Sequence, residues 1–337
     1  MSFLRSYRLR LRRRRLQIRA LRKKSELKNI VNNISKIDRD DVLVIATLKD
    51  ELVRLPFFLD YYRKLGAGHF LLIDNNSSDG SADFLKNQPD VSLWSTAASY
   101  KTARYGLDWI NWLLRKYGRQ RWCLIVDMDE FFVYPFCDTR PLRALTEWLD
   151  NSSVRSFGAM QIDMYPKGEL QDTTYEVGQN PFEIAKWFDT GNYTFEKNEN
   201  MGNLWIQGGP RARKFFPDAP KTAPALNKIP LVKWQRGYVY ESSTHMLLPR
   251  GLNQVYEVNG GEKASGVLLH FKLFDSLSEL SLKAVDQEEH YANSYEYQQY
   301  LFGLKENSDL WNNWSEQYIN WRQLEILGLM SKGNWAY

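Results

Sequence analysis

Short apolar runs alternate with segments of helical apolar spacing between Asp41 and Asn151. The predicted strands are 42–47, 69–74, 90–96 and 121–127. The predicted helices between them are 51–66 and 103–118, and 75–88 is predicted to be a loop followed by the start of a helix and the helix itself. Strands that alternate with helices favour parallel pairing through right-handed crossovers. The pattern therefore predicts an α/β fold with a mostly parallel, twisted, Rossmann-like sheet flanked by helices.

The alternation fades after about residue 140. One further helix (141–151) and one strand (156–165) are predicted, and a loop-rich stretch rich in Gly, Pro and Trp then runs from 166 to 265. The part from 274 onward has helical character with many Trp and Tyr residues. We predict three regions: an N-terminal tail (1–40), a main α/β domain (41–273) and a C-terminal helical region (274–337).

The first thirty residues lack Gly and Pro and are predicted to be helical. An apolar stripe at 3.6-residue spacing runs along this segment and comprises Phe3, Leu4, Tyr7, Leu11, Ile18 and Leu21, with Arg14 interrupting it. An apolar stripe flanked by arginines is typical of an interfacial helix on anionic lipid. A disordered solubilising tail and a non-specific RNA-binding tail are the alternatives.

Charge is distributed very unevenly along the chain. Residues 1–30 contain 12 of the 45 Lys and Arg residues but only one acid, Glu26, so the tail carries about +11 and the rest about −6. A nucleic-acid function would therefore rest on the tail alone.

The two cysteines, Cys123 and Cys137, suggest no disulfide framework. The absence of an 18–20-residue apolar run and of a secretory signal predicts a cytoplasmic protein.

Polar clusters follow three of the predicted strands: Thr47–Glu51, Asp74–Gly80 and Asp127–Glu130. Each cluster alone could be a turn or a helix cap. In a parallel sheet, however, the carboxyl ends of the strands meet at one edge, where ligands bind. Asp127 and Asp129 project from the same side if the strand persists through them, and paired carboxylates with no nearby His or Cys suit Mg²⁺ or Mn²⁺.

The sequences ATLKDE, IDNNSSDG and WCLIVDMDEFF, in this order and spacing, resemble the GT-A glycosyltransferases, in particular the bacterial family-2-like group with a D-x-D-E-F motif. The resemblance covers about 42–150 well. It continues more weakly through GGPRARKFF, NKIPLVKW, STH and LLHFKL. It implies a GT-A fold in which 41–150 binds the nucleotide sugar and 151–273 is a loop-rich acceptor half.

The resemblance also implies a donor site. Thr47, Glu51 and Asp74 would line the nucleoside pocket, Asp79 would lie near the base and ribose, and Lys49 and Asn76 belong to the same predicted site. Asp127 and Asp129 would hold the ribose and the metal ion, which bridges both phosphates and assists departure of the nucleotide diphosphate. Arg104, Arg211 and Arg213 are the candidate phosphate ligands.

A late histidine completes the metal shell in related enzymes, and His270 is the first candidate for it. His245 is its rival as a metal or acceptor ligand, and either could instead be a core histidine. An inverting reaction needs a general base, for which Asp163 and Glu130 are candidates. A retaining enzyme would need no such base.

The function implied by the resemblance is metal-dependent transfer of a sugar, of the hexosyltransferase type, from a nucleotide diphosphate sugar to an acceptor hydroxyl. A basic tail at the cytoplasmic face of a membrane suits synthesis of a cell-surface polysaccharide or a glycolipid. The alternatives are a nucleotidyltransferase or phosphotransferase, and a non-catalytic module that binds nucleotide sugars or RNA.

Overall fold

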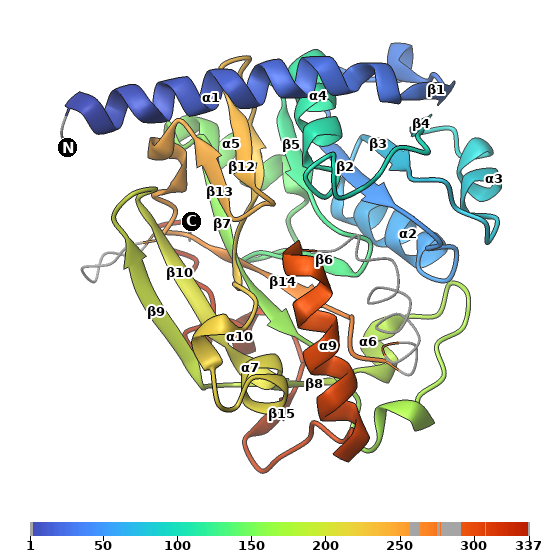
Figure 1. Cartoon of the computed structure of the whole chain (residues 1–337), viewed down its shortest axis with the longest axis vertical. Coiled ribbons are helices and arrows are strands. Elements are labelled where there is room, and N and C mark those ends of the chain that lie inside the picture. Colours follow the sequence, from blue (N-terminus) through green and yellow to red (C-terminus); the bar gives the residue numbers. More distant parts are fainter. Residues whose placement is uncertain (1–2, 257–262, 275–276, 278–290, 307, 336–337) are drawn as a thin grey trace.

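The structure is a computed structural model, and it describes residues 3–256, 263–274, 277, 291–306 and 308–335. A nine-stranded sheet, counted over these residues, forms the centre of the fold in the order β1-β4-β3-β2-β5-β11-β7-β14-β6 (Figure 1). Its strands are β1 (Lys28–Val31), β2 (Leu43–Leu48), β3 (His69–Asp74), β4 (Val91–Ser95), β5 (Trp122–Ile125), β6 (Glu130–Val133), β7 (Ser156–Asp163), β11 (Asn227–Lys233) and β14 (Gly266–His270).

Two-stranded sheets and helices surround this sheet. The small sheets pair β8 (Trp187–Asp189) with β15 (Ser315–Gln317), β9 (Tyr193–Asn198) with β10 (Asn203–Gly208), and β12 (Val239–Ser242) with β13 (Met246–Leu248). The helices are α1 (Phe3–Lys23), α2 (Leu55–Leu65), α3 (Ser81–Lys86), α4 (Leu107–Tyr117), α5 (Leu142–Asn151), α6 (Pro181–Ile184), α7 (Gly209–Phe215), α9 (Tyr291–Glu306) and α10 (Trp321–Ile326).

Helices cover both faces of the sheet because its strands are apolar on both sides. Along β2, Val44 and Ala46 pack in one core cluster with Phe58 of α2, whereas Ile45 on the opposite face packs in a second cluster with Leu113 of α4. Every apolar side chain of β2 is buried, and its polar residue Thr47 is half-buried. Strands buried on both faces are the expected pattern for parallel strands covered by helices.

The predicted α/β class is confirmed, and the strands β4, β3, β2 and β5 pair in parallel as expected. The rest of the sheet is mixed, because β11 pairs antiparallel with both β5 and β7, and β6 pairs antiparallel with β14. The stretch 166–265, which was expected to be loop-rich, therefore supplies a central strand. That expectation was wrong for β11.

Several predicted boundaries differ from the structure. The strand predicted over 121–127 ends at Ile125, so the D-x-D residues lie in a turn instead of on the strand. The helix predicted over 103–118 begins at Leu107. Part of the predicted C-terminal helical region (278–290) lies outside the described residues. Within the described part of the chain, no helix is both long and apolar enough to cross a bilayer.

Candidate functional site at the carboxyl ends of the parallel strands

A cavity of about 590 Å³ opens where the parallel strands β2, β3 and β5 end. All three polar clusters that follow these strands contribute to its wall. It is lined by Thr47, Leu48, Lys49, Glu51, Asn75, Asn76, Ala97, Ala98, Ser99, Tyr100, Asp127, Met128, Asp129, His270, Lys272 and Tyr297. The topology thus places these polar side chains at the sheet edge where α/β folds bind ligands.

A tight turn between β5 and β6 presents Asp127 and Asp129. The Glu130 N–H donates to the Asp127 carbonyl oxygen (3.1 Å), and the Asp127 N–H donates to Glu130 Oε2 (3.0 Å). The Phe271 N–H donates to the Asp129 carbonyl oxygen (2.8 Å), which ties the turn to the end of β14. The turn is therefore fixed from two sides, and its two aspartates face the cavity.

His270 is held between two carboxylates. Its Nδ1 lies 2.6 Å from Asp163 Oδ1, and its Nε2 lies 3.3 Å from Asp129 Oδ2. Burial disfavours the charged imidazole, but Asp129 and Asp163 outweigh it and raise the pKa of His270. Burial likewise opposes ionisation of Asp129, yet the adjacent His270 lowers the pKa of that carboxyl far below its ordinary value. Asp163 therefore orients the ring so that Nε2 points toward Asp129.

Lys228 of β11 neutralises the other side of the turn. Its Nζ lies 3.0 Å from Glu130 Oε1 and 4.0 Å from Asp127 Oδ2. The Lys228 and Glu130 side chains are nearly inaccessible, whereas the Asp127 side chain is 58% exposed and can reach a ligand. Lys228 and His270 together explain how Asp127, Asp129 and Glu130 can lie so close in sequence without prohibitive repulsion.

The donor chemistry of Asp129 and His270 fits a divalent cation. Their ligating atoms converge at the cavity wall, and a carboxylate behind the histidine is the usual outer support of a metal-binding imidazole. In the described part of the chain, however, no three His, Cys, Asp or Glu side chains are grouped so as to hold a metal ion. Two protein ligands suit an ion that takes its other ligands from substrate phosphates and water, as Mg²⁺ and Mn²⁺ commonly do.

Among the cavity residues that were not predicted as site residues, Lys272 and Tyr100 offer a charge and an aromatic face to a ligand. Lys272 follows β14, and its Nζ lies 3.3 Å from Glu296 Oε1 and 4.5 Å from the centre of the Tyr297 ring. Burial disfavours the charged ammonium group of Lys272. Glu296, Tyr297 and Tyr300 outweigh this effect and raise the pKa of Lys272 well above its ordinary value. Tyr100 supplies an aromatic wall, and burial raises its pKa. The sequence HFK, with its cation two residues after the candidate histidine, is the signal that could have identified Lys272.

Seven of the predicted site residues line the cavity: Thr47, Lys49, Glu51, Asn76, Asp127, Asp129 and His270. Among them, Glu51 also pairs with Arg54 at 2.7 Å. Burial raises the pKa of Glu51, and Arg54 opposes this shift. Glu51 is thus a carboxylate of the cavity wall with a fixed cationic partner.

Asp74 and Asp79 shape the loops and do not line the cavity. Asp74 is buried and accepts from the Ser77 N–H (3.3 Å). Asp79 accepts from the Leu52 N–H (2.8 Å) and from the Ser81 hydroxyl (2.6 Å), so it joins the loop after β3 to the loop after β2. The structure gives both aspartates a positioning role.

The three predicted phosphate-binding arginines point elsewhere. Arg104 donates to the carbonyl oxygen of Glu241 (2.7 Å), and Arg213 pairs with Asp189 (2.8 Å). Arg211 is buried and donates from Nε to Asp163 Oδ2 (2.7 Å), behind His270. None of the three belongs to the cavity wall.

The two predicted bases and His245 are also outside the cavity wall. Both carboxylate oxygens of Asp163 are engaged, by Arg211 and His270, and Glu130 is buried against Lys228. His245 Nδ1 lies 2.6 Å from the Asn227 carbonyl oxygen, and burial lowers its pKa to about 3, which makes it a neutral structural histidine.

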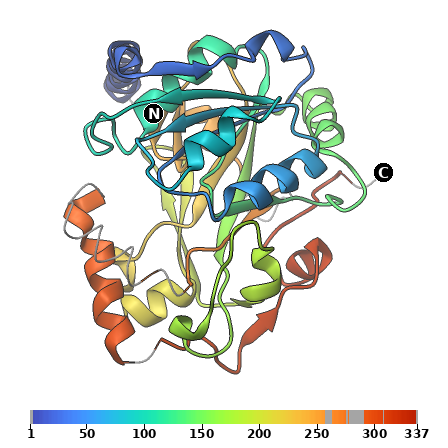
Figure 2. The same ribbon diagram turned by 90° about the vertical axis from the view of Figure 1, so that its right-hand side faces the viewer.

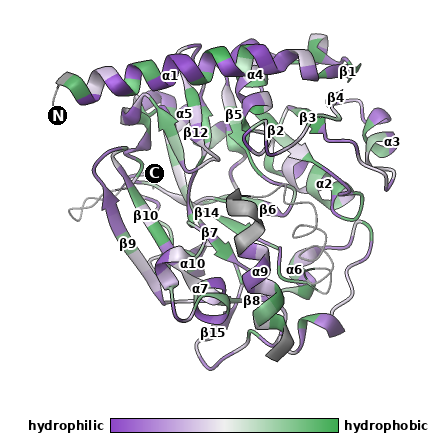
Figure 3. Cartoon of the chain, viewed as in Figure 1, coloured by the Kyte–Doolittle hydropathy of each residue, from purple (hydrophilic) through white to green (hydrophobic). Residues whose placement is uncertain are grey.

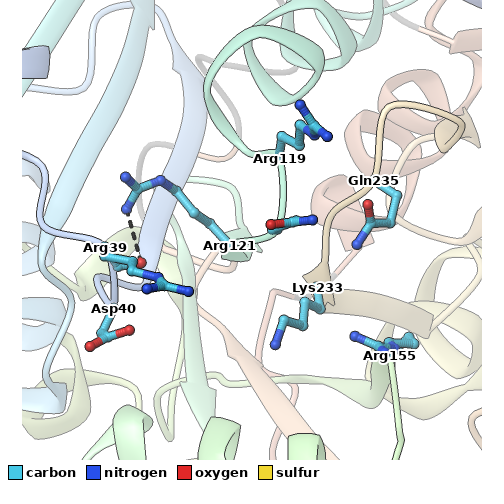
Figure 4. Close-up of a pocket in the computed structure, with 8 residues that line it drawn as sticks. Arg39, Asp40, Arg119, Arg121, Arg155, Lys233 and Gln235 are labelled. Carbon is cyan, nitrogen blue, oxygen red and sulfur yellow. Dashed lines mark hydrogen bonds between the residues drawn. The ribbon is translucent and has the colours of Figure 1, made fainter.

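A second hollow, of about 430 Å³, lies at the opposite end of the sheet (Figure 4). Arg121 and Arg155 immediately precede β5 and β7, and Arg39, Arg119 and Lys233 complete its basic wall. Arg121 donates to the Arg39 carbonyl oxygen (3.2 Å). This hollow contains none of the predicted site residues.

Comparisons with known proteins identify no family. No protein-family model matches the chain, and no curated protein matches its sequence. Among solved structures, the chain is similar to the crystal structure of a 4-diphosphocytidyl-2C-methyl-D-erythritol synthase, with 13% identity and a TM-score of 0.25. The match covers 42% of this chain and 66% of that one, slightly less than two thirds. A similarity of this size carries no argument about activity.

Proposed function

We propose that the protein is a metal-dependent glycosyltransferase that moves a sugar from a nucleotide diphosphate sugar to an acceptor hydroxyl. The observation that carries the proposal is the convergence of Asp127, Asp129, His270 and Lys272 on one cavity at the carboxyl ends of parallel strands. A pair of carboxylates and a histidine beside Lys49 and Lys272 suits a diphosphate that is bound through a divalent ion. The resemblance of the D-x-D-E-F sequence to GT-A enzymes agrees with this proposal.

In the proposed reaction, Asp129 and His270 Nε2 hold the ion, which would be Mn²⁺ or Mg²⁺. The ion, when bound, supplies Lewis-acid stabilisation of the charge that develops on the departing nucleotide diphosphate. Asp127 is exposed enough to bind the ribose or the ion. In this proposal Lys272 and Lys49, instead of the three arginines predicted from the sequence, bind the phosphate oxygens as point charges.

The nucleoside end of the donor is proposed to lie against the loops after β2 and β3. Thr47, Glu51 and Asn76 offer polar contacts there, and Tyr100 offers a flat aromatic face. Asp74 and Asp79 act indirectly by fixing these loops. Neither Asp163 nor Glu130 reaches the cavity, so our proposal assigns no catalytic base to them.

A thermal-shift screen of nucleotide diphosphate sugars tests donor binding. In the presence of Mn²⁺, the correct donor at about 100 times its Kd should stabilise the folded state by about 2.7 kcal/mol and raise the Tm by a few degrees. Removing the ion with EDTA should abolish most of this shift. A screen in which no nucleotide sugar gives a metal-dependent shift would contradict the proposal.

The released product separates glycosyl transfer from the nucleotidyl transfer that paired carboxylates could also support. Glycosyl transfer consumes a nucleotide diphosphate sugar and releases the nucleoside diphosphate. Nucleotidyl transfer consumes a nucleoside triphosphate and releases pyrophosphate. Release of pyrophosphate with no release of nucleoside diphosphate would replace our proposal with the nucleotidyltransferase alternative, and binding without either product would indicate a binding module.

The acceptor is proposed to be a glycolipid or a growing cell-surface polysaccharide at the cytoplasmic face of a membrane, where a peripheral protein would reach it. The basic N-terminal segment supports this location, because it concentrates about +11 of charge on a chain whose remainder is negative.

A further inference from the structure

Helix α1 lies across the outside of the body and is packed along one face. Figure 1 shows it spanning the molecule beside α4 and β12, and Figure 2 views it nearly along its axis at the edge of the fold. Ala20 is only 2% exposed, and Leu9 and Leu16 pack against a cluster that includes Met201 and Leu248. The segment is thus a helix packed on the body of the protein, and it differs from the disordered tail that was considered as an alternative.

Ionic contacts fix the rotation of α1 about its own axis. Arg19 Nε donates to Asp108 Oδ2 at 2.6 Å, and the Asp108 side chain is fully buried. Arg12 pairs with Glu241, whose side chain is only 7% exposed. Because these contacts anchor one side of the helix to the body, its opposite side must face outward.

The outward side carries the predicted apolar stripe. Leu4, Tyr7, Leu11, Ile18 and Leu21 are between 38% and 68% exposed, and at 3.6 residues per turn they fall opposite Leu9, Leu16 and Ala20. The side chain of Phe3 lies outside the described part of the chain. Figure 3 shows apolar and polar residues alternating along this helix. Exposed apolar side chains aligned in this way indicate an interaction surface.

Arginines flank the same stripe. Arg8, Arg10, Arg14, Arg15 and Arg22 are all exposed, and in the described part of the chain their guanidinium groups have no hydrogen-bond or ion-pair partner. The arginines that do pair with the body, such as Arg12 and Arg19, belong to the side of the helix nearer to it. The outward face therefore combines aliphatic side chains with unneutralised positive charge.

We propose that this outward face of α1 is a docking surface for an anionic lipid bilayer. The aliphatic side chains would enter the boundary between headgroups and acyl chains while the arginines meet the phosphates. A nucleic acid would use the arginines but would leave the aliphatic stripe exposed to water. Charge complementarity together with the apolar stripe therefore favours lipid as the occupant.

Docking through a helix that is fixed to the body gives the whole protein one orientation on the membrane. α1 contacts both α4 and β12, so its orientation relative to the sheet is set by packing. This proposal does not depend on the reaction at the cavity, because no residue of α1 lines it.

Co-sedimentation of the full chain with vesicles tests the surface. The protein should bind phosphatidylcholine vesicles containing about 30% phosphatidylserine and should bind pure phosphatidylcholine vesicles at least tenfold more weakly. Leu11→Ser/Ile18→Ser and, separately, Arg14→Glu/Arg15→Glu should each weaken binding to the anionic vesicles at least tenfold. These side chains are exposed, so the variants should keep the Tm of the parent protein.

Matched controls make the same chemical changes elsewhere on the surface. Ile319→Ser/Ile326→Ser removes two aliphatic side chains that are 71% and 85% exposed, and Lys64→Glu/Lys186→Glu reverses two exposed charges. Both controls should retain vesicle binding.

Equal binding to neutral and anionic vesicles, no binding to either, or equal losses in controls and α1 variants would overturn the proposal. Binding to single-stranded RNA without vesicle binding would overturn it in favour of nucleic acid.

Discussion

Asp129→Asn is expected to lower the rate of glycosyl transfer by at least about 100-fold while leaving the fold intact. The substitution removes the negative charge that faces His270 Nε2 at 3.3 Å and therefore removes a proposed metal ligand of the cavity wall. The stabilisation lost with the ion would be several kcal/mol in the transition state, and each 1.36 kcal/mol is tenfold in rate. Initial rates of nucleoside diphosphate release at saturating Mn²⁺ measure the effect.

The main chain at Asp129 should be undisturbed by this change, because its carbonyl oxygen, not its side chain, accepts from the Phe271 N–H. Asp218→Asn is the matched control, since Asp218 is exposed and lies outside the cavity wall. The control should keep full activity. Undiminished transfer by Asp129→Asn, with a Tm like that of the parent protein, would remove Asp129 from the proposed metal site.

The parallel half of the sheet could be predicted because its strands are short and continuously apolar. VLVIAT and HFLLID correspond closely to β2 and β3, and both are buried throughout their apolar positions. Crossover helices with clear apolar spacing separate these strands, so the order of elements alone indicates parallel pairing. The shared edge of the three polar clusters follows from that pairing and not from any single motif.

The central strand β11 could not be predicted in the same way. Its sequence, NKIPLVK, contains a polar Asn, a buried Lys228 and Pro230, which argues against a central strand because proline cannot donate to the ladder. The structure accommodates this proline with an irregularity, since the register of β11 against β7 shifts between Lys228 and Leu231. The local sequence therefore argues against a strand at 227–233, whereas the tertiary structure places β11 between β5 and β7.

The contacts that hold the residues of the candidate site in place could not be predicted from the sequence either. Asp163 reaches His270 because β7 and β14 pair in parallel with these two residues as partners in the register, although 107 positions separate them. Without that register, Asp163 is only an acid on the strand that follows the D-x-D residues, and it was expected to act as a base because the resemblance places the base after the D-x-D. Lys228 of β11 likewise contacts Glu130 of β6, although these two strands are distant in the sequence and are not neighbours in the sheet.

Lys228→Met is expected to destabilise the folded protein by about 3–5 kcal/mol. Lys228 and Glu130 form a buried pair at 3.0 Å, with side chains 6% and 1% exposed. Removing only the cation leaves the Glu130 charge buried without compensation, and leaves Asp127 without the cation that lies 4.0 Å from it. Equilibrium unfolding in urea, followed by tryptophan fluorescence, measures the change in the free energy of unfolding.

The double variant Lys228→Met/Glu130→Gln separates the charge of the pair from its packing. The glutamine side-chain oxygen can still accept the Asp127 N–H, as Glu130 Oε2 does at 3.0 Å, so the turn keeps its hydrogen bond without a buried charge. We expect the double variant to recover most of the stability lost in Lys228→Met, because replacing both members of a buried ion pair is far less costly than replacing one. Equal destabilisation of the single and double variants would instead mean that Lys228 stabilises the strand by packing, and that Glu130 is neutralised by another group.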